Sequence, residues 1–331
     1  LSNLMPVGLK DLVIFCRQFS SLVNSGVAMM RTMTILSAQA ENPKLARVLK
    51  EVKADVEQGL SLSDSFSKHP QIFDNLFVSM IRAGETGGVL DEVLNRLAKF
   101  MEEKARLANK IKSAMAYPTV VTILAVIIFF VMLTFILPKF SEIFSKLGSE
   151  LPAYTQFLIN ISKVLRSAWL IVIIFGIGCI GYGFNRLYST EKGKYIIDKI
   201  CLRIPVFGGL LQKVAVSRFT RTFGTLVKSG VPILASLEIV EESSGNAVLA
   251  KSVREIREEV KQGGTISGPL ERSEIFPPMV VSMIAVGEET GELDSMLSKI
   301  ADFYDSEIES AVEALTSLLE PLMIVFLGGM V

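Results

Sequence analysis

Residues that could support common enzyme chemistry are few and scattered in this chain. His69 is the single histidine, and Cys16, Cys179 and Cys201 fall in no CxxC or metal-ligand spacing. The sequence contains no GxxxxGK[ST] phosphate-binding loop and no GxSxG or HExxH motif. We therefore predict a protein that is not an enzyme, with no catalytic residue, no intrinsic ATP hydrolysis, no cofactor and no metal site.

Two glycine-rich segments are the strongest candidates for a ligand site. They share glycine and glutamate positions, namely Gly84, Glu85 and Gly88 in one and Gly287, Glu288 and Gly291 in the other. Glycines allow backbone amides to approach an anion, but each segment carries a carboxylate that would repel phosphate and lies between two amphipathic helical patterns. We favour a helix-to-helix turn whose glycines adopt positive φ, with a partner-docking corner as the functional alternative.

Several carboxylates leave two interpretations open. Glu320 precedes Pro321 at an expected membrane entrance, where the matching residue is Tyr117, so it is either a functional intramembrane acid or a solvated interfacial one. The remaining acids could gather a divalent cation between helices or line solvated helix faces, and we favour the second. They are Glu102, Glu103, Asp305, Glu307 and Glu309.

Long apolar runs alternate with charged segments. The mean hydropathy is +0.45 and half of the residues are hydrophobic, and 26 uncharged residues lie between Lys112 and Lys139. We predict a first transmembrane helix at 113–137, an extracytoplasmic loop at 138–167, a second transmembrane helix at 168–185 and the start of a third at 321–331. A buried soluble helix is the alternative for the second run. The ends at Leu1 and Val331 suggest a fragment cut at both ends, without a secretory signal pattern at its start.

The charges are spread unevenly along the chain. Residues 1–112 carry a net +3, residues 113–204 a net +5, and residues 205–320 a net −8. Basic residues flank the first two spans, which places the charged segments in the cytoplasm by the positive-inside rule. An acidic second half without a basic, aromatic-rich stripe argues against nucleic-acid binding.

An internal repeat organises the charged segments. Shifting the chain by 204 residues superposes residues 15–27 on 219–231 with eight identities in thirteen, and a shift of 203 continues the match beyond residue 79. We predict homologous cytoplasmic domains at 10–112 and 213–320, joined through a connector at 186–212, each running into a membrane helix. A parallel repeat separated by two spans places both domains on one side.

Helical periodicity runs through both repeats. Apolar residues recur at i, i+3, i+4 and i+7, for example from Leu293 to Tyr304. Gly26 and Gly230 are typical helix stops, and Ser61 to Asp64 is typical of a capping box. We predict an all-α, polytopic membrane protein with about six helices per domain and three transmembrane helices, the third truncated.

The repeated motifs in their order resemble the type II secretion F-domain family, the inner-membrane platform proteins of type IV pilus and type II secretion machines. The resemblance covers nearly the whole chain. The motifs include Arg17-Gln-Phe, Ser25-Gly-Val, Tyr117-Pro118, Pro138-Lys-Phe, Leu151-Pro152 with Thr155, and Ser229-Gly-Val-Pro. The candidate interaction or structural residues are Arg17, Gly26, Gly84, Glu85, Gly88, Pro118, Arg221, Gly230, Gly287, Glu288, Gly291, Glu320 and Pro321.

This resemblance implies a scaffold in the bacterial inner membrane. Its six-helix domains would self-associate as dimers or higher oligomers and engage a hexameric assembly or retraction ATPase, other inner-membrane assembly proteins, and pilin or pseudopilin subunits within the lipid bilayer. A type IV pilus platform is the leading interpretation and a type II secretion platform the alternative. A small-molecule transporter is more remote, because the two complete spans hold no ionisable residue.

Overall fold

The computed structural model describes residues 6–146, 156–157, 159–160, 169–205 and 207–330. Within these ranges the secondary structure is helical and contains no strand, which confirms the predicted all-α class. The expected extracytoplasmic loop at 138–167 begins as a helix, but most of it, including Leu151, Pro152 and Thr155, lies outside the described residues.

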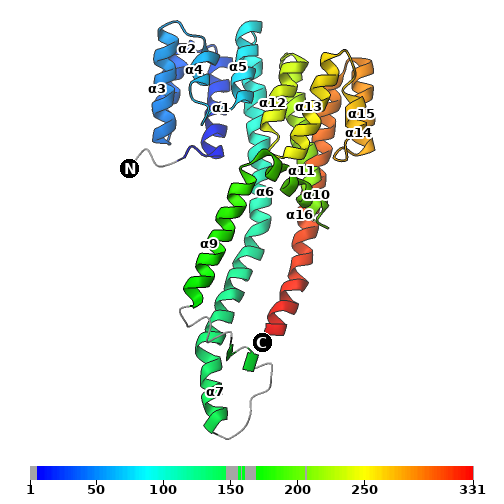
Figure 1. The fold of residues 1–331 in the computed structure, drawn as a ribbon. Helices are drawn as coiled ribbons and strands as arrows, with labels where there is room; N and C mark the ends of the chain where they lie inside the picture. The colour runs from blue at the N-terminus through cyan, green and yellow to red at the C-terminus, as the bar shows by residue number, and fades with distance from the viewer. Residues whose placement is uncertain (1–5, 147–155, 158, 161–168, 206, 331) are drawn as a thin grey trace. The chain divides into compact units, whose positions relative to one another are not determined.

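Each repeat contains six helices (Figure 1). The first repeat comprises α1 (Leu9–Asn24), α2 (Met29–Gln39), α3 (Pro43–Glu57), α4 (Leu62–Ser67), α5 (Asn75–Gly87) and α6 (Leu90–Val131). The second comprises α11 (Phe207–Lys228), α12 (Ile233–Ser243), α13 (Ala247–Lys261), α14 (Ser267–Arg272), α15 (Pro278–Thr290) and α16 (Leu293–Met330). The helices recur in the same order because the apolar periodicity and the stop signals were duplicated together.

Local signals set the helix ends as predicted. Gly26 and Gly230 follow α1 and α11 with φ of 75° and 79°, a left-handed conformation that glycine adopts without a Cβ clash. The Ser61 hydroxyl accepts a hydrogen bond from the Asp64 amide at 3.0 Å, which confirms the N-cap of the expected capping box. Pro232 is the N-cap of α12.

A compact unit formed by Leu1–Lys110 and Asp198–Ser310 contains both helical repeats. In the first repeat the buried rings of Phe15, Phe66, Phe73 and Phe77 contact one another, with 4.5 Å between the centroids of Phe66 and Phe73. Aromatic clusters bury a large apolar area per residue, so this cluster stabilises the packing of α1, α4 and α5. Phe219, Phe223 and Phe276 form the smaller counterpart in the second repeat.

A second unit comprises Ile111–Ile197 and Ala311–Val331. It holds the end of α6, a π-helical turn η1 (Met132–Ile136), α7 (Leu137–Lys146), α9 (Trp169–Tyr188), most of α10 (Glu191–Arg203) and the end of α16. The π turn precedes Pro138, whose missing N–H disturbs regular α-helical bonding. Thr122 and Met323 are 3.8 Å apart, from hydroxyl oxygen to sulfur, so α6 and α16 lie side by side there.

Among the described residues, the helical stretch Leu90–Phe140 is the one helix that is long and apolar enough to cross a membrane. A second candidate arises only if α10 and α11, which meet at a bend of 116°, are counted as one span. The predicted second span falls on α9 and the start of the third on the end of α16. Both remain predictions.

Candidate functional site

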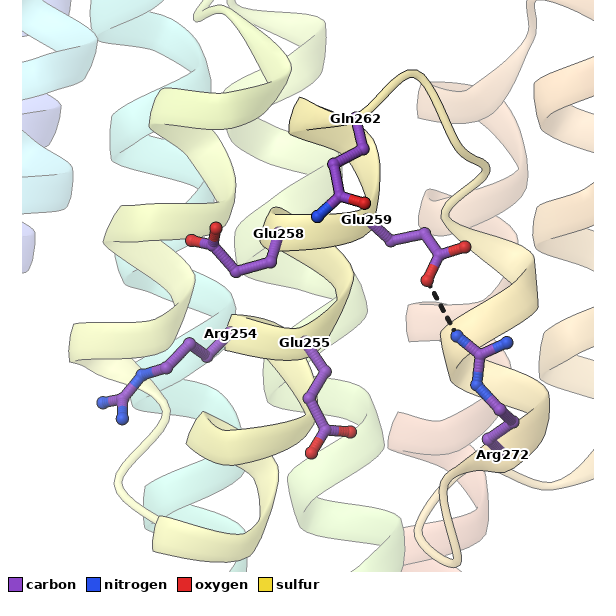
Figure 2. Close-up of a pocket in the computed structure, with 6 residues that line it drawn as sticks. All are labelled: Arg254, Glu255, Glu258, Glu259, Gln262 and Arg272. Atoms are coloured by element: carbon purple, nitrogen blue, oxygen red, sulfur yellow. Dashed lines mark hydrogen bonds and ion pairs between the residues drawn. The ribbon is translucent and has the colours of Figure 1, made fainter.

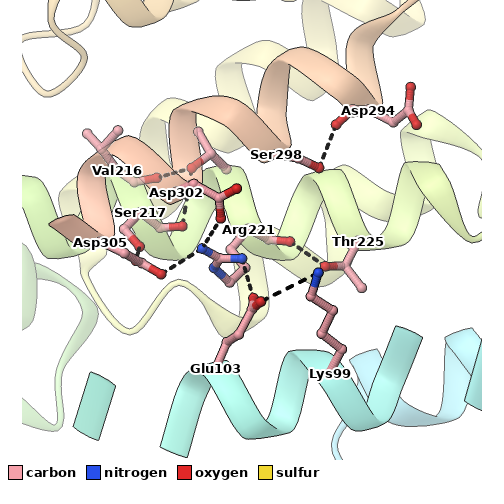
Figure 3. A network of polar contacts seen from close by, with 11 residues as sticks. Lys99, Glu103, Val216, Ser217, Arg221, Thr225, Asp294, Ser298, Asp302 and Asp305 are labelled. Atoms are coloured by element: carbon pink, nitrogen blue, oxygen red, sulfur yellow. Dashed lines mark hydrogen bonds and ion pairs between the residues drawn. The ribbon is translucent and has the colours of Figure 1, made fainter. Parts of the chain in front are cut away.

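The most elaborate polar cluster surrounds Arg221 on α11 (Figure 3). Its guanidinium donates to Asp302 at 2.9 Å and to Asp305 at 2.6 Å on α16, and it pairs with Glu103 on α6. The side chains of Arg221 and Asp305 are only 15% and 7% exposed. Burial opposes the charge, but the Asp305, Asp302 and Glu103 carboxylates outweigh it and raise the pKa of Arg221.

The same position in the first repeat holds a simpler version of this cluster. Arg17 pairs with Glu102 through a bond of 2.6 Å from Nε to Oε1, and these two residues match Arg221 and Asp305 in the repeat. The hydrogen bond raises the pKa of Arg17 and lowers that of Glu102. The pair is 49% and 37% exposed, so solvent weakens it. The same ion pair therefore joins the first and last helices of both bundles, and it is buried in the second repeat only.

The two repeats contact each other through α5 and α6 of the first and through α11, α12 and α16 of the second. Glu103 on α6 reaches Arg221 on α11, and Asn75 on α5 donates to Glu242 on α12 at 2.5 Å. Arg96 donates to the Lys228 carbonyl, and Lys110 pairs with Glu309. Charged and polar side chains thus fix the register of the contact between the repeats.

The glutamates of the two glycine-rich segments act as helix caps. Glu85 accepts hydrogen bonds from the amides of Leu62 and Ser63 at 2.6 and 2.9 Å, at the start of α4. Glu288 repeats this contact at the start of α14, where the donors are the amides of Ile266 and Ser267 at 2.5 and 2.9 Å. A carboxylate satisfies the free N–H groups of a helix N-terminus and interacts favourably with its dipole. The same bonds tie α5 to α4 and α15 to α14.

The expectation that these glycines have positive φ holds for Gly88 and Gly291 and is wrong for Gly84 and Gly287. Gly88 and Gly291 cap α5 and α15 with φ of 67° and 75°. Gly84 and Gly287 lie inside those helices, where a Cβ would come within 3.1 and 3.0 Å of the Cα atoms of Leu90 and Leu293. They are required because the next helix passes too close for a side chain.

Pro118 and Pro321, expected at the membrane entrance, both lie inside long helices, α6 and α16 respectively. Glu320 belongs to α16, and its side chain lies outside the described part of the structure. The alternatives for that carboxylate therefore stay open. A proline within a helix removes one backbone hydrogen bond, so each proline marks a point where the helix can bend.

The acids that suggested a cation site or solvated faces form ion pairs between helices. Glu102 and Glu307 stay 37% and 40% exposed, whereas Asp305 is 7% exposed. Besides the pairs of Glu102, Glu103 and Asp305, Glu307 pairs with Lys213 at 2.7 Å and Glu309 with Lys110. Within the described residues no group of three or more histidine, cysteine or carboxylate side chains is arranged to hold a metal ion. Neither earlier interpretation recognised that basic residues from distant segments would meet these acids.

An open hollow on the second repeat lies against α13 and α14 (Figure 2). It is lined by Arg254, Glu255, Glu258, Glu259, Gln262 and Arg272. Glu259 and Arg272 pair at 2.9 Å across it, and the matching residues Asp55 and Lys68 pair at 2.8 Å in the first repeat. That ion pair is a duplicated clip between two helices. Glu258, which matches Ala54, adds to the acidic character of the second repeat.

These features define an all-helical protein with two copies of one six-helix unit and at least one helix able to span a membrane. Its sequence matches the profile of the family described as Type II secretion system (T2SS), protein F, over residues 15–138 and again over 219–331. The chain belongs to this family. Both matches begin at equivalent phenylalanines, Phe15 and Phe219, which confirms the internal repeat.

Several characterised relatives cover almost the whole chain. It is 45% identical to the type IV pilus assembly protein PilC of Thermus thermophilus over 98% of this chain and 80% of that protein. Identity to PilC of Myxococcus xanthus is 42%, over 97% of this chain and 77% of that protein. Identity to the type II secretion system protein F of Aeromonas hydrophila is 36%, over 97% and 82%.

Proposed function

We propose that this chain is the inner-membrane platform protein of a type IV pilus machine, coupling a cytoplasmic hexameric motor ATPase to filament assembly. Family membership and the similarity to PilC relatives named as type IV pilus assembly proteins support the proposal. The observation that carries it is α6, which packs in the core of the first repeat and continues without a break into the apolar stretch that ends at Phe140. A continuous helix transmits displacement between a soluble bundle and a span.

Both helical repeats, at 10–112 and 213–320, would lie in the cytoplasm as domains that engage the ATPase and neighbouring assembly proteins. Pilin subunits would meet the membrane part. The repeats differ in charge, +3 for residues 1–112 and −8 for residues 205–320, so they would present different surfaces to their partners. Cysteine-accessibility labelling of each repeat in sealed inner-membrane vesicles tests this topology, and a repeat reactive only from the periplasmic side would contradict it.

The coupling role is tested by insertions into α6 just before the apolar stretch. Four glycines placed after Ala114 should interrupt the helix, whereas four alanines extend it by about 6 Å with a rotation of about 40°. We expect both variants to bind the motor ATPase in pull-downs from solubilised membranes. Only the alanine variant should retain substantial pilus assembly. Equal assembly by both variants would contradict mechanical coupling through α6.

The type II secretion platform is the second candidate, because a relative of that name shares 36% identity with this chain. The pilus relatives rank higher at 45% and 42%. Expression in two hosts, one lacking its pilus platform gene and one lacking its secretion platform gene, separates the two. We expect recovery of pili in the first host. Recovery of protein export alone would favour the secretion role.

A further inference from the structure

The contact between the two repeats is heterologous, because each repeat contributes a different face. The first repeat uses α5 and α6. The second uses mainly α11 and α12, which match α1 and α2, together with Glu309 on α16. Among the described residues, the main helix pairings between the repeats involve α5, α11 and α12 and do not involve α1, α2 or α15. A heterologous contact leaves one complementary face open at each end.

Equivalent residues on the last two helices of each repeat, α5 and α6 in the first and α15 and α16 in the second, differ in exposure. Leu76, Met80 and Phe100 on α5 and α6, the two helices of the first repeat that contact the second repeat, are 3%, 0% and 9% exposed. Their matches on α15 and α16 are apolar but uncovered, with Met279 42% exposed, Met283 half-buried and Phe303 46% exposed. Val286 is also 46% exposed. We define Met279, Met283, Val286 and Phe303, with Lys299, as the α15–α16 patch.

The complementary face on α1 and α2 carries residue types similar to those at the matching positions of α11 and α12, several of which are buried. Ser229, Val231 and Ile239 are buried in the second repeat. The matching residues of the first repeat are Ser25, which is exposed, and Val27 and Ile35, which are half-buried. We define Arg17, Ser21, Ser25, Val27 and Ile35 as the α1–α2 face. The small side chains of Ser21, Ser25 and Val27 on this face leave room for the bulkier residues of the α15–α16 patch.

Some polar contacts between the two repeats also have matching residues on the two uncovered faces. Arg96 donates to the carbonyl of Lys228 within the chain, and the matching residues are Lys299, again a donor, and Asn24. Lys110 pairs with Glu309, and the matching residues in register are Glu313 and Arg106, so the signs are exchanged while the attraction is kept. Two internal contacts have no polar counterpart. Glu103 is matched by Ser306, and the Asn75–Glu242 hydrogen bond is matched by Pro278 and Ala38.

We propose that the α15–α16 patch of one molecule binds the α1–α2 face of a second copy, head to tail, in the same way as the two repeats bind within one chain. The proposal rests on the proposed platform function and names surfaces for the self-association that the family resemblance implies. The contact follows from continuity with the internal interface and from matching charge. It lacks the counterparts of Glu103 and of the Asn75–Glu242 hydrogen bond, so it is weaker than the internal contact and reversible.

A disruptive substitution gives the first test. Phe303→Asp places a charge in the centre of the patch and should raise the dissociation constant of self-association at least about tenfold, measured by light scattering of the full chain in detergent. Ile14→Asp is the matched control, because Ile14 is 40% exposed on α1 but its match, Arg218, stays exposed beside the internal contact. Equal self-association of both variants would overturn the proposal.

A substitution that strengthens self-association gives a second test, whose expected result cannot come from a loss of folding. Ser306→Glu recreates the match of Glu103 opposite Arg17 of the next molecule, so self-association should tighten by about threefold to tenfold. Adding Arg17→Glu to the same chain should reverse the gain. A Ser306→Glu chain that associates no better than the parent would contradict the predicted register.

Cross-linking tests the faces directly in native membranes. In a chain whose natural cysteines are replaced by serine, Asn24→Cys with Lys299→Cys should give a ladder of linked molecules with a short bismaleimide. Arg96→Cys with Lys228→Cys is the control and should link within one chain. Links through Lys299→Cys alone would indicate an isologous dimer and refute the proposal, as would an absent ladder when the control links. These measurements need no motor ATPase, so their failure is distinct from failure of the proposed function.

Discussion

Replacing Arg221 with methionine removes the cation that three carboxylates share. Asp305 would keep one neutral donor, the Ser217 hydroxyl at 2.5 Å, while remaining 7% exposed. Breaking a buried ion pair by removing one partner costs about 3–5 kcal/mol. Asp302 is 71% exposed and regains water, so we expect a value near the lower end, about 3 kcal/mol.

Arg17 supplies the matched control, because Arg17→Met is the same change at the equivalent position of the other repeat. Its pair with Glu102 is 49% and 37% exposed, and pairs of this kind contribute about 0–1 kcal/mol. For a cooperative unit of this size, about 2–4 °C accompanies each kcal/mol. Thermal unfolding of the full chain in one detergent, followed by circular dichroism, should show a loss of about 6–12 °C for Arg221→Met and less than about 4 °C for Arg17→Met.

A double variant separates the orphaned charge from lost packing. Combining Arg221→Met with Asp305→Asn should recover a substantial part of the lost stability, because the uncompensated buried charge is removed. High salt should abolish the small effect of Arg17→Met and leave that of Arg221→Met largely intact. Equal losses for the two single variants, or no recovery in the double variant, would refute the assignment of Arg221 as a buried clamp.

Three further outcomes follow from local geometry. Gly84→Ala should cost about 1–3 kcal/mol because its Cβ would lie 3.1 Å from the Leu90 Cα, whereas Gly209→Ala, with nothing within 4 Å, should be neutral or stabilise by up to about 1 kcal/mol; similar melting temperatures would argue against the close approach. Glu288→Gln should cost about 1–2 kcal/mol and speed amide exchange at the start of α14, and unchanged exchange would count against the cap. The hydrogen bond from Arg17 lowers the pKa of Glu102, so the ion pair stabilises the fold fully above the unfolded pKa of about 4.3, and this stabilisation is lost as the pH falls through the folded pKa. Glu102→Gln should therefore reduce the loss of stability in acid. An unchanged pH profile of stability would exclude this ion pair as a cause.

Local signals predicted the fold well because they act within one or two turns. The glycines after α1 and α11 ended those helices as expected, and Gly88 and Gly291 adopted positive φ. Gly84 was misjudged because its requirement is tertiary, since the backbone of Leu90 leaves no room for a Cβ. A sequence pattern records the glycine in both cases but does not distinguish its conformational role from its packing role.

The polar site escaped prediction because its partners are distant in sequence. Arg17 and Glu102 are 85 residues apart, and Glu85 caps a helix that begins 23 residues before it. A usable signal was nevertheless present. Opposite charges recur at matching positions of both repeats, as Arg17 with Glu102 and as Arg221 with Asp305. A pair of opposite charges kept through a duplication indicates contact more strongly than either residue alone.

Comparison of the two repeats also explains why Arg221 forms buried ion pairs whereas Arg17 forms an exposed one. The bond to the last helix of its own bundle is present in both repeats, so it belongs to the ancestral six-helix unit. What Arg221 adds is Glu103, a residue of the other repeat, and the position matching Glu103 in the second repeat is Ser306. The internal contact therefore carries a buried charge that the external contact lacks. The contact within the chain is therefore expected to be stronger than the proposed contact between copies.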